Sequence, residues 1–128
     1  MGQGRGRVGP VGAIPPGTVV LVPFPFTDLS GRKQRPAIAV SPLGFHAEDV
    51  VVCAVTSQVP PELTRWELSL SADDLEERRL PKPSVILVRK VFTIHRELIR
   101  DQFGMLRREK LASVLARLRE LFGEAARA

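Results

Sequence analysis

The sequence predicts a mainly β fold, a small barrel of short strands with peripheral helices, formed by a single domain. Eleven prolines and ten glycines in 128 residues are too many for a helical bundle and suit short strands joined by turns. Several β-branched, apolar runs of strand length are bounded by turn residues, whereas helical periodicity is confined to the last segment. A chain of this length has room for one modest hydrophobic core.

The domain is expected to span residues 17–123, after a disordered, basic Gly/Pro-rich lead-in at 1–16 and before a short C-terminal tail at 124–128. The predicted strands cover residues 18–26, 35–41, 50–56, 66–70, 84–91 and 102–106. Pro23 and Pro25 cannot donate ladder hydrogen bonds, so the first strand should become an edge or a bulge at its end.

Three helical segments are expected beside these strands. Residues 71–77 begin with a capping serine and early acids, as a short helix should, and residues 93–99 suit a turn or a single helical turn. After residue 107, leucines, a valine and a phenylalanine recur at helical spacing on one face, and Gly123 is the predicted stop. Such a one-sided apolar stripe must pack on the barrel or on a second subunit.

Charge and cysteine content limit the classes of function. A formal net charge of +5 and a pI near 10.3 favour a polyanionic partner, either nucleic acid or an acidic protein segment, with a merely basic surface as the alternative. Cys53, the single cysteine, lies in an apolar run and is expected to be a buried hydrophobe. No zinc-type cluster, cofactor, signal core or membrane-spanning run is predicted, so we expect a cytoplasmic protein without a metal.

The loop and strand at residues 31–40 carry the candidate site. Arg35 precedes a proline, which keeps it out of the helical region, so its planar fork of donors should be held extended at the strand start. Arg32 and Lys33 suit contacts with the phosphates of a nucleic-acid backbone. The third strand is apolar almost throughout, which predicts cover on both faces, and it ends where the hydroxyls of Thr56 and Ser57 emerge.

The ordered set of PFPFTD, the basic loop, RPAIAV, the buried strand ending in Thr56-Ser57, LPKPSVILV and a C-terminal amphipathic helix resembles the MazF/PemK-like toxin family. The resemblance covers roughly residues 17–122. It implies an SH3-like barrel of the MazF/PemK/CcdB type, a homodimer, and metal-independent, sequence-selective cleavage of single-stranded RNA (mRNA). It also implies a cognate antitoxin with an acidic disordered segment, and it matches the family's catalytic positions to Arg35 and Thr56.

Other residues carry alternatives. Ser57 is a neighbouring match, Asp28 either anchors the basic loop or makes its turn, and His46 is either a helper at the site or an exposed loop histidine. The chain departs from the family where an aspartate is usual at Thr18 and where an acid–glutamine pair is usual at Arg89-Lys90. These departures keep open a non-catalytic RNA- or antitoxin-binding module or a gyrase-directed toxin on the same fold, and, more remotely, a peptide-binding adaptor.

Overall fold

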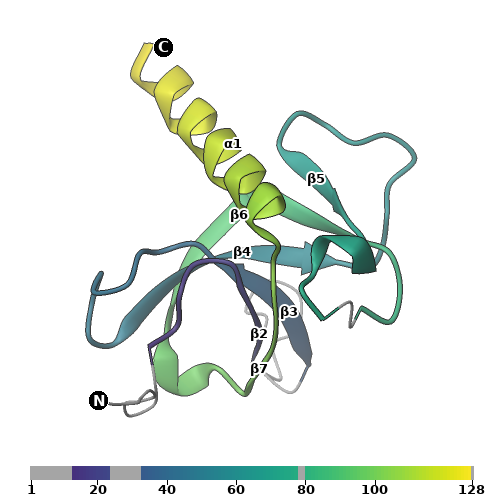
Figure 1. Ribbon diagram of the computed structural model, residues 1–128. Helices are drawn as coiled ribbons and strands as arrows, with labels where there is room; N and C mark the ends of the chain where they lie inside the picture. Colours follow the sequence, from purple (N-terminus) through teal and green to yellow (C-terminus); the bar gives the residue numbers. More distant parts are fainter. Residues whose placement is uncertain (1–12, 24–32, 78–79, 128) are drawn as a thin grey trace.

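Six antiparallel strands form one curled sheet that makes a half-barrel, with a long helix at one end (Figure 1). The computed structural model describes residues 13–23, 33–77 and 80–127. The strands are β2 (Thr18–Pro23), β3 (Gln34–Ala39), β4 (Asp49–Thr56), β5 (Glu67–Leu70), β6 (Ser84–His95) and β7 (Asp101–Met105), in the spatial order β5-β6-β4-β3-β2-β7. Two single turns, η1 (Ala72–Asp74) and η2 (Arg96–Leu98), and the helix α1 (Arg108–Arg127) complete the fold. The predicted mainly β architecture is confirmed.

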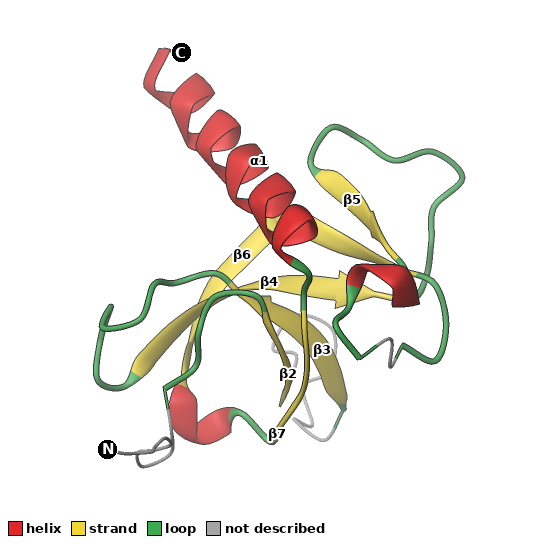
Figure 2. Cartoon of the chain, in the orientation of Figure 1, coloured by secondary structure: helices red, strands yellow, loops and turns green. Residues whose placement is uncertain are grey.

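The two outer strands of the sheet are brought together beyond their ends. Leu75, directly after η1, forms a bridge with Leu106, directly after β7. Two backbone hydrogen bonds support this junction: Glu76 N–H donates to the Met105 carbonyl at 2.9 Å, and Arg107 N–H donates to the Asp74 carbonyl at 2.7 Å. Figure 2 shows η1 beside the start of the long helix at this junction. The bridge therefore connects the two outer strands of the half-barrel at one end.

Both faces of the sheet are covered, which explains why β4 is apolar along nearly its whole length. One face carries a cluster of buried residues that includes Ile38 and Cys53, and Val114 of α1 packs into it. The other face carries a second cluster, which includes Val20, Ala37 and Val52. Cys53 lies in the cluster that packs against α1 and is fully buried, as predicted.

The strand β6 is longer than the sequence predicted. It continues to His95, so residues 93–95, which we expected to lie in a turn, are strand instead. The reason is an irregularity in the ladder between β4 and β6. Leu87 pairs with Ala54 and Val91 pairs with Cys53, which leaves residues 88–90 unmatched in β4. This bulge bends β6 and allows one strand to serve both ends of β4.

The helix α1 also exceeds its predicted end. It runs through Gly123 to Arg127, so the predicted stop at Gly123 was wrong. The following residues, Glu124, Ala125 and Ala126, are good helix formers, and they carry the helix past the glycine. Residues 124–127 therefore continue the helix rather than forming a separate tail.

At the N-terminal end, residues 13–16 are part of the described structure. Ile14 is buried with the second cluster, and the Thr18 hydroxyl donates to the Pro15 carbonyl at 2.7 Å. Structured residues are thus present before residue 17, the predicted start of the domain, and Thr18 supports the turn that precedes β2. Residues 1–12 of the predicted lead-in lie outside the described residues.

Two negative findings apply to the described ranges, 13–23, 33–77 and 80–127. None of their helices is long and apolar enough to cross a membrane. They contain no group of three or more His, Cys, Asp or Glu side chains that could hold a metal ion.

Candidate active site

Arg35 and Thr56 are brought to neighbouring positions by the pairing of β3 with β4. Ala37 pairs with Ala54 in this ladder, and continuing the antiparallel register by two residues brings Arg35 opposite Thr56. Because side chains alternate along a strand, both residues lie on the face that carries Ala37 and Ala54. Directly opposite side chains in such a pair have Cβ atoms about 4.5–5.5 Å apart.

The two neighbouring strands hold these residues in place. Arg35 pairs with Val22 of β2, so it is extended within a ladder, as the following proline predicted. Thr56 ends β4 and pairs with Val85 of β6. The Thr56 hydroxyl oxygen accepts a hydrogen bond from Gln58 N–H at 3.1 Å. This bond orients the hydroxyl and leaves its own hydrogen to donate to a ligand.

A pocket of about 210 Å³ opens beside this pair. Its lining combines three cationic side chains, polar Thr56 and Gln58, and an apolar wall: Arg35, Val55, Thr56, Gln58, Leu87, Arg89 and Lys90. None of these seven residues is acidic. The chemistry of the pocket therefore suits an anion with several oxygen atoms, such as a phosphate diester.

A buried carboxylate lies behind one of the cations. The side chain of Glu67 in β5 is 6% exposed, and its Oε2 accepts a hydrogen bond from Arg89 Nε at 2.9 Å. Its Oε1 accepts the Thr64 N–H at 2.8 Å. The bond from the Thr64 backbone and the bond from the Arg89 guanidinium both hold the pKa of the Glu67 carboxyl below its usual range. Glu67 is therefore an ionised anchor rather than a proton donor.

A PemK-like, MazF-like toxin model, of type II toxin–antitoxin systems, matches residues 15–122. The chain belongs to this toxin family. No curated protein matches the sequence of the toxin.

Solved structures of MazF-like proteins share the fold of this toxin. An endoribonuclease in complex with its cognate antitoxin from a mycobacterial species aligns with a TM-score of 0.67 at 18% identity, covering 87% of this chain and 96% of that chain. MazE–MazF from Deinococcus radiodurans aligns with the same TM-score and the same coverage at 24% identity. The Mycobacterium tuberculosis toxin MazF-mt6 aligns with a TM-score of 0.64 at 18% identity, covering 83% and 96%. The predicted barrel of the MazF/PemK type is thereby confirmed.

The other predicted site residues of the toxin are distributed unevenly. Ser57 follows Thr56 directly and is exposed, and Lys33 is exposed just before β3, so both lie near the candidate pair along the chain. Asp28 and Arg32 lie outside the described residues.

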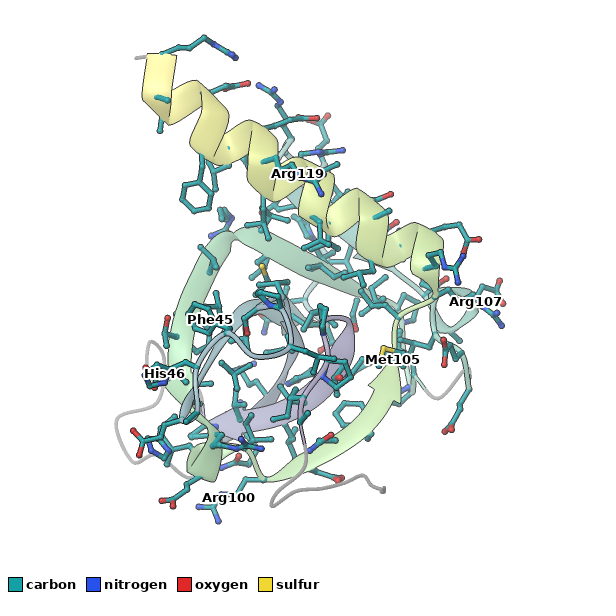
Figure 3. All side chains as sticks on the ribbon, turned by 60° about the vertical axis from the view of Figure 1, so that its left-hand side comes forward. Phe45, His46, Arg100, Met105, Arg107 and Arg119 are labelled. Atoms are coloured by element: carbon teal, nitrogen blue, oxygen red, sulfur yellow. The ribbon has the colours of Figure 1, made fainter. Side chains whose placement is uncertain are left out.

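His46 lies before β4, at the opposite end of this strand from Thr56. It precedes β4, whereas Thr56 ends it, and the length of that eight-residue strand separates them by about 23 Å at about 3.3 Å per residue. Figure 3 shows His46 and Phe45 together on one side of the barrel, away from Met105 of β7. The imidazole Nδ1 instead accepts the backbone N–H groups of Glu48 and Asp49 at 3.1 and 3.2 Å. His46 therefore shapes its own loop, in line with the exposed loop histidine that was one of the two sequence-based alternatives.

Gln58, Arg89, Lys90 and the anchor Glu67 were not predicted to be site residues. Arg89-Lys90 was noted only as a departure from the family. Two successive cations directly after the apolar run VILV interrupt its pattern, and this interruption could have indicated a bulge. No sequence pattern connects Glu67 with Arg89, since 22 residues separate them and an ordinary half-buried strand was expected there.

Cys53 is not a candidate nucleophile. Burial raises the pKa of its thiol to about 12, so the thiolate is scarce at neutral pH.

Proposed function

We propose that this toxin is a metal-independent endoribonuclease that cleaves single-stranded RNA at the Arg35–Thr56 pair. The observation that carries the proposal is the pairing of β3 with β4, which sets an arginine beside a threonine in a pocket without acidic lining. The endoribonuclease named among the similar structures supports the same reaction class.

The proposed reaction is an internal transesterification of RNA. The 2′-oxygen attacks the adjacent phosphorus and loses its proton, while the P–O5′ bond breaks and the 5′-oxygen gains a proton. The products are a 2′,3′-cyclic phosphate and a free 5′-hydroxyl. The pentacoordinate intermediate carries additional negative charge, so a fixed cation is the main requirement for catalysis.

Each residue of the pair has a defined part in this proposal. The Arg35 guanidinium stabilises the developing charge, and it is also the candidate group for moving the two protons. Thr56 donates its hydroxyl hydrogen to a non-bridging oxygen. This hydrogen is available because the hydroxyl oxygen acts as the acceptor in the bond from Gln58 N–H. Lys33 and Arg32 are proposed to attract the RNA backbone, an effect that salt weakens.

The proposed partners follow from charge and family. The net charge of +5 and the cationic pocket suit both an RNA strand and an antitoxin whose acidic segment occupies the same surface. An antitoxin complex among the structural neighbours supports such a partner. The proposal further includes a homodimer, as in the family that the sequence resembles.

The decisive experiment incubates a long unstructured RNA with the purified toxin in EDTA and maps the ends of the products. The wild type should give discrete fragments with 5′-hydroxyl ends. Arg35→Ala should lose about 10²–10³ in rate, the usual effect of removing a preorganised donor to a developing oxyanion. Thr56→Ala should lose about 10- to 150-fold, the equivalent of one hydrogen bond to a charged group.

The matched control is Arg119→Ala, which removes an exposed guanidinium from α1, on a different element from the pocket (Figure 3). It should cleave RNA like the wild type. RNA left intact by a folded wild-type toxin would refute the nuclease, and tight binding of that intact RNA would establish the non-catalytic binding module in its place. Equal losses for Arg35→Ala and Arg119→Ala, which remove the same charge, would show that bulk charge rather than the pair is responsible.

A further inference from the structure

The bulge of β6 delivers two cations to the pocket from the side opposite Arg35. Residues 88–90 have no partner in β4, and the Val88 and Arg89 N–H groups instead approach the Trp66 carbonyl at 2.9 and 3.4 Å. The chain therefore leaves the regular ladder at this point, and both Arg89 and Lys90 reach the lining of the pocket. A regular strand would have pointed successive side chains to opposite faces.

Glu67 fixes one of these cations. Its carboxylate binds the Nε of Arg89 and is itself held by the Thr64 backbone, so the inner edge of the guanidinium is anchored. The exposed fractions of the two side chains, 6% for Glu67 and 47% for Arg89, show that the anchor is covered while the guanidinium reaches the surface. The Nε bond leaves the two terminal nitrogens of Arg89 as donors toward the pocket.

The charges on the two sides of the pocket favour two separate oxyanions. Arg35 lies on β3 and Lys90 on β6, with β4 between them, so the two strands are about two strand spacings, or about 10 Å, apart. Arg89 is balanced by Glu67, whereas Lys90 has no ion pair within the described part of the chain and leaves this side with a net positive charge. One phosphate between Arg35 and Thr56 would not occupy this second side.

We propose that Arg89 and Lys90 form a second phosphate-binding position, which holds a phosphate next to the scissile one on the same RNA strand, and that Glu67 is its positioning residue. The inference rests on the proposed function, because it takes the Arg35–Thr56 pair as the place of the scissile phosphate. RNA is favoured over an acidic peptide because a strand held at this pair carries its neighbouring phosphates with it, at fixed spacing.

The first test measures the salt dependence of RNA binding, using an unstructured RNA that is 2′-O-methylated throughout and cannot be cleaved. Replacing Lys90 with glutamine should remove one phosphate contact and lower the slope of log K against log salt by about 0.7. If the two proteins bind equally at 1 M salt, this difference in slope makes the variant bind RNA about fivefold more weakly than the wild type at 0.1 M salt. Lys82→Gln makes the same charge change on the exposed loop before β6 and should leave the slope unchanged.

The second test uses the sign of the effect of Glu67→Gln, which removes the carboxylate charge without changing the size of the side chain. If Glu67 positions Arg89, releasing the guanidinium should weaken RNA binding by a factor of about two to three, the equivalent of about 0.5 kcal/mol. If Glu67 were simply a negative charge near the pocket, its neutralisation would tighten binding. A lower melting temperature with unchanged affinity would show a purely structural role and would overturn the positioning proposal.

The outcomes separate this inference from the proposed nuclease. Because the methylated RNA cannot react, a smaller slope for Lys90→Gln alone supports the second position even if unmodified RNA is never cut. Equal slopes for Lys90→Gln and Lys82→Gln would overturn it. Unchanged RNA binding by Lys90→Gln, with weaker binding of an acidic peptide, would assign this side of the pocket to a protein partner and would also overturn it.

Discussion

Glu67 illustrates how a single buried charge is retained in a small barrel. A carboxylate out of contact with water is costly unless it is paired and hydrogen-bonded, and here Arg89 and the Thr64 N–H occupy its two oxygens. The same two bonds lower the pKa of the Glu67 carboxyl, so the folded protein favours the ionised form more than the unfolded chain does.

This difference predicts a dependence of stability on pH. The contribution of the Glu67 charge should be fully present above the pKa of an unfolded glutamate, about 4.3, and should be lost as the pH falls through the lower folded value. The melting temperature of the wild type should therefore exceed that of Glu67→Gln near pH 7, and the gap should narrow below about pH 4.3. A gap that stays constant down to pH 3 would mean that packing, rather than charge, is what Glu67 contributes.

The sequence around a residue predicted its position or burial in some cases and not in others. The position of Arg35 was predictable because a proline fixes the backbone before it, and Cys53 was predictable because its neighbours are all apolar. Glu67 was not predictable, since its burial depends on Arg89, a partner brought beside it only by the pairing of β5 with β6. The separation of His46 from Thr56 was also not predictable, since it depends on the full length of β4, which His46 precedes and Thr56 ends.

At the scale of elements, the start of β2 is fixed by the backbone of Gly17. This residue has φ = 96°, and its N–H and carbonyl bond the Ala39 carbonyl at 2.7 Å and the Leu106 N–H at 2.9 Å. A Cβ at this position would lie 3.1 Å from the Met105 sulfur and 3.3 Å from a Leu111 methyl carbon. The glycine thus joins β2, β3, β7 and the helix at one crowded point.

Two glycine-to-alanine substitutions should therefore change the free energy of unfolding in opposite directions. Gly17→Ala should lower the free energy of unfolding by about 1–2 kcal/mol, because an L-residue in the left-handed region carries that penalty. Gly123→Ala should raise it by up to about 1 kcal/mol, since Gly123 lies within α1, a Cβ there would have no neighbouring atom within 4 Å, and alanine is the better helix former. Urea unfolding measures both; a stabilised Gly17→Ala would show that this turn relaxes without strain.

The elements themselves were predictable where local pattern decides them. The extents of β3 and β4 differ from the prediction by no more than two residues, because proline, turn residues and an apolar run mark their ends. The continuation of β6 to His95 was not predictable, since the bulge that permits it is stabilised by the Trp66 carbonyl, which lies outside this strand. Gly123 misled because a glycine ends a helix only when the chain needs to turn there.

At the scale of the whole molecule, the described surface leaves several large apolar side chains exposed. They include Leu43 at 60%, Phe45 at 49% and Phe122 at 58% exposure. The C-terminal half of α1, which carries Phe122, extends away from the strands in Figure 1. An exposed aromatic ring on a helix that extends beyond the strands is a candidate contact for a partner.

We therefore expect the purified toxin to form a homodimer. Light scattering coupled to gel filtration should give twice 14.1 kDa, or about 28 kDa, at micromolar concentration. Phe122→Ser removes the exposed aromatic ring of α1 and should shift the measured mass toward that of the monomer. A mass of about 14 kDa for the wild type at every concentration would contradict the dimer.

The order of strands in the sheet also has a consequence for the biogenesis of the toxin. Among the described strands β2 is synthesised first, yet one of its two neighbours is β7, which begins at Asp101. Once residue 100 has been added, the nascent chain already contains Arg35 and Thr56 but has neither β7 nor α1 to cover the Val19 face. Adding residues 101–127 takes seconds. The barrel can be completed only after residues 101–127 leave the exit tunnel, so the translation of this segment delays the appearance of a folded toxin.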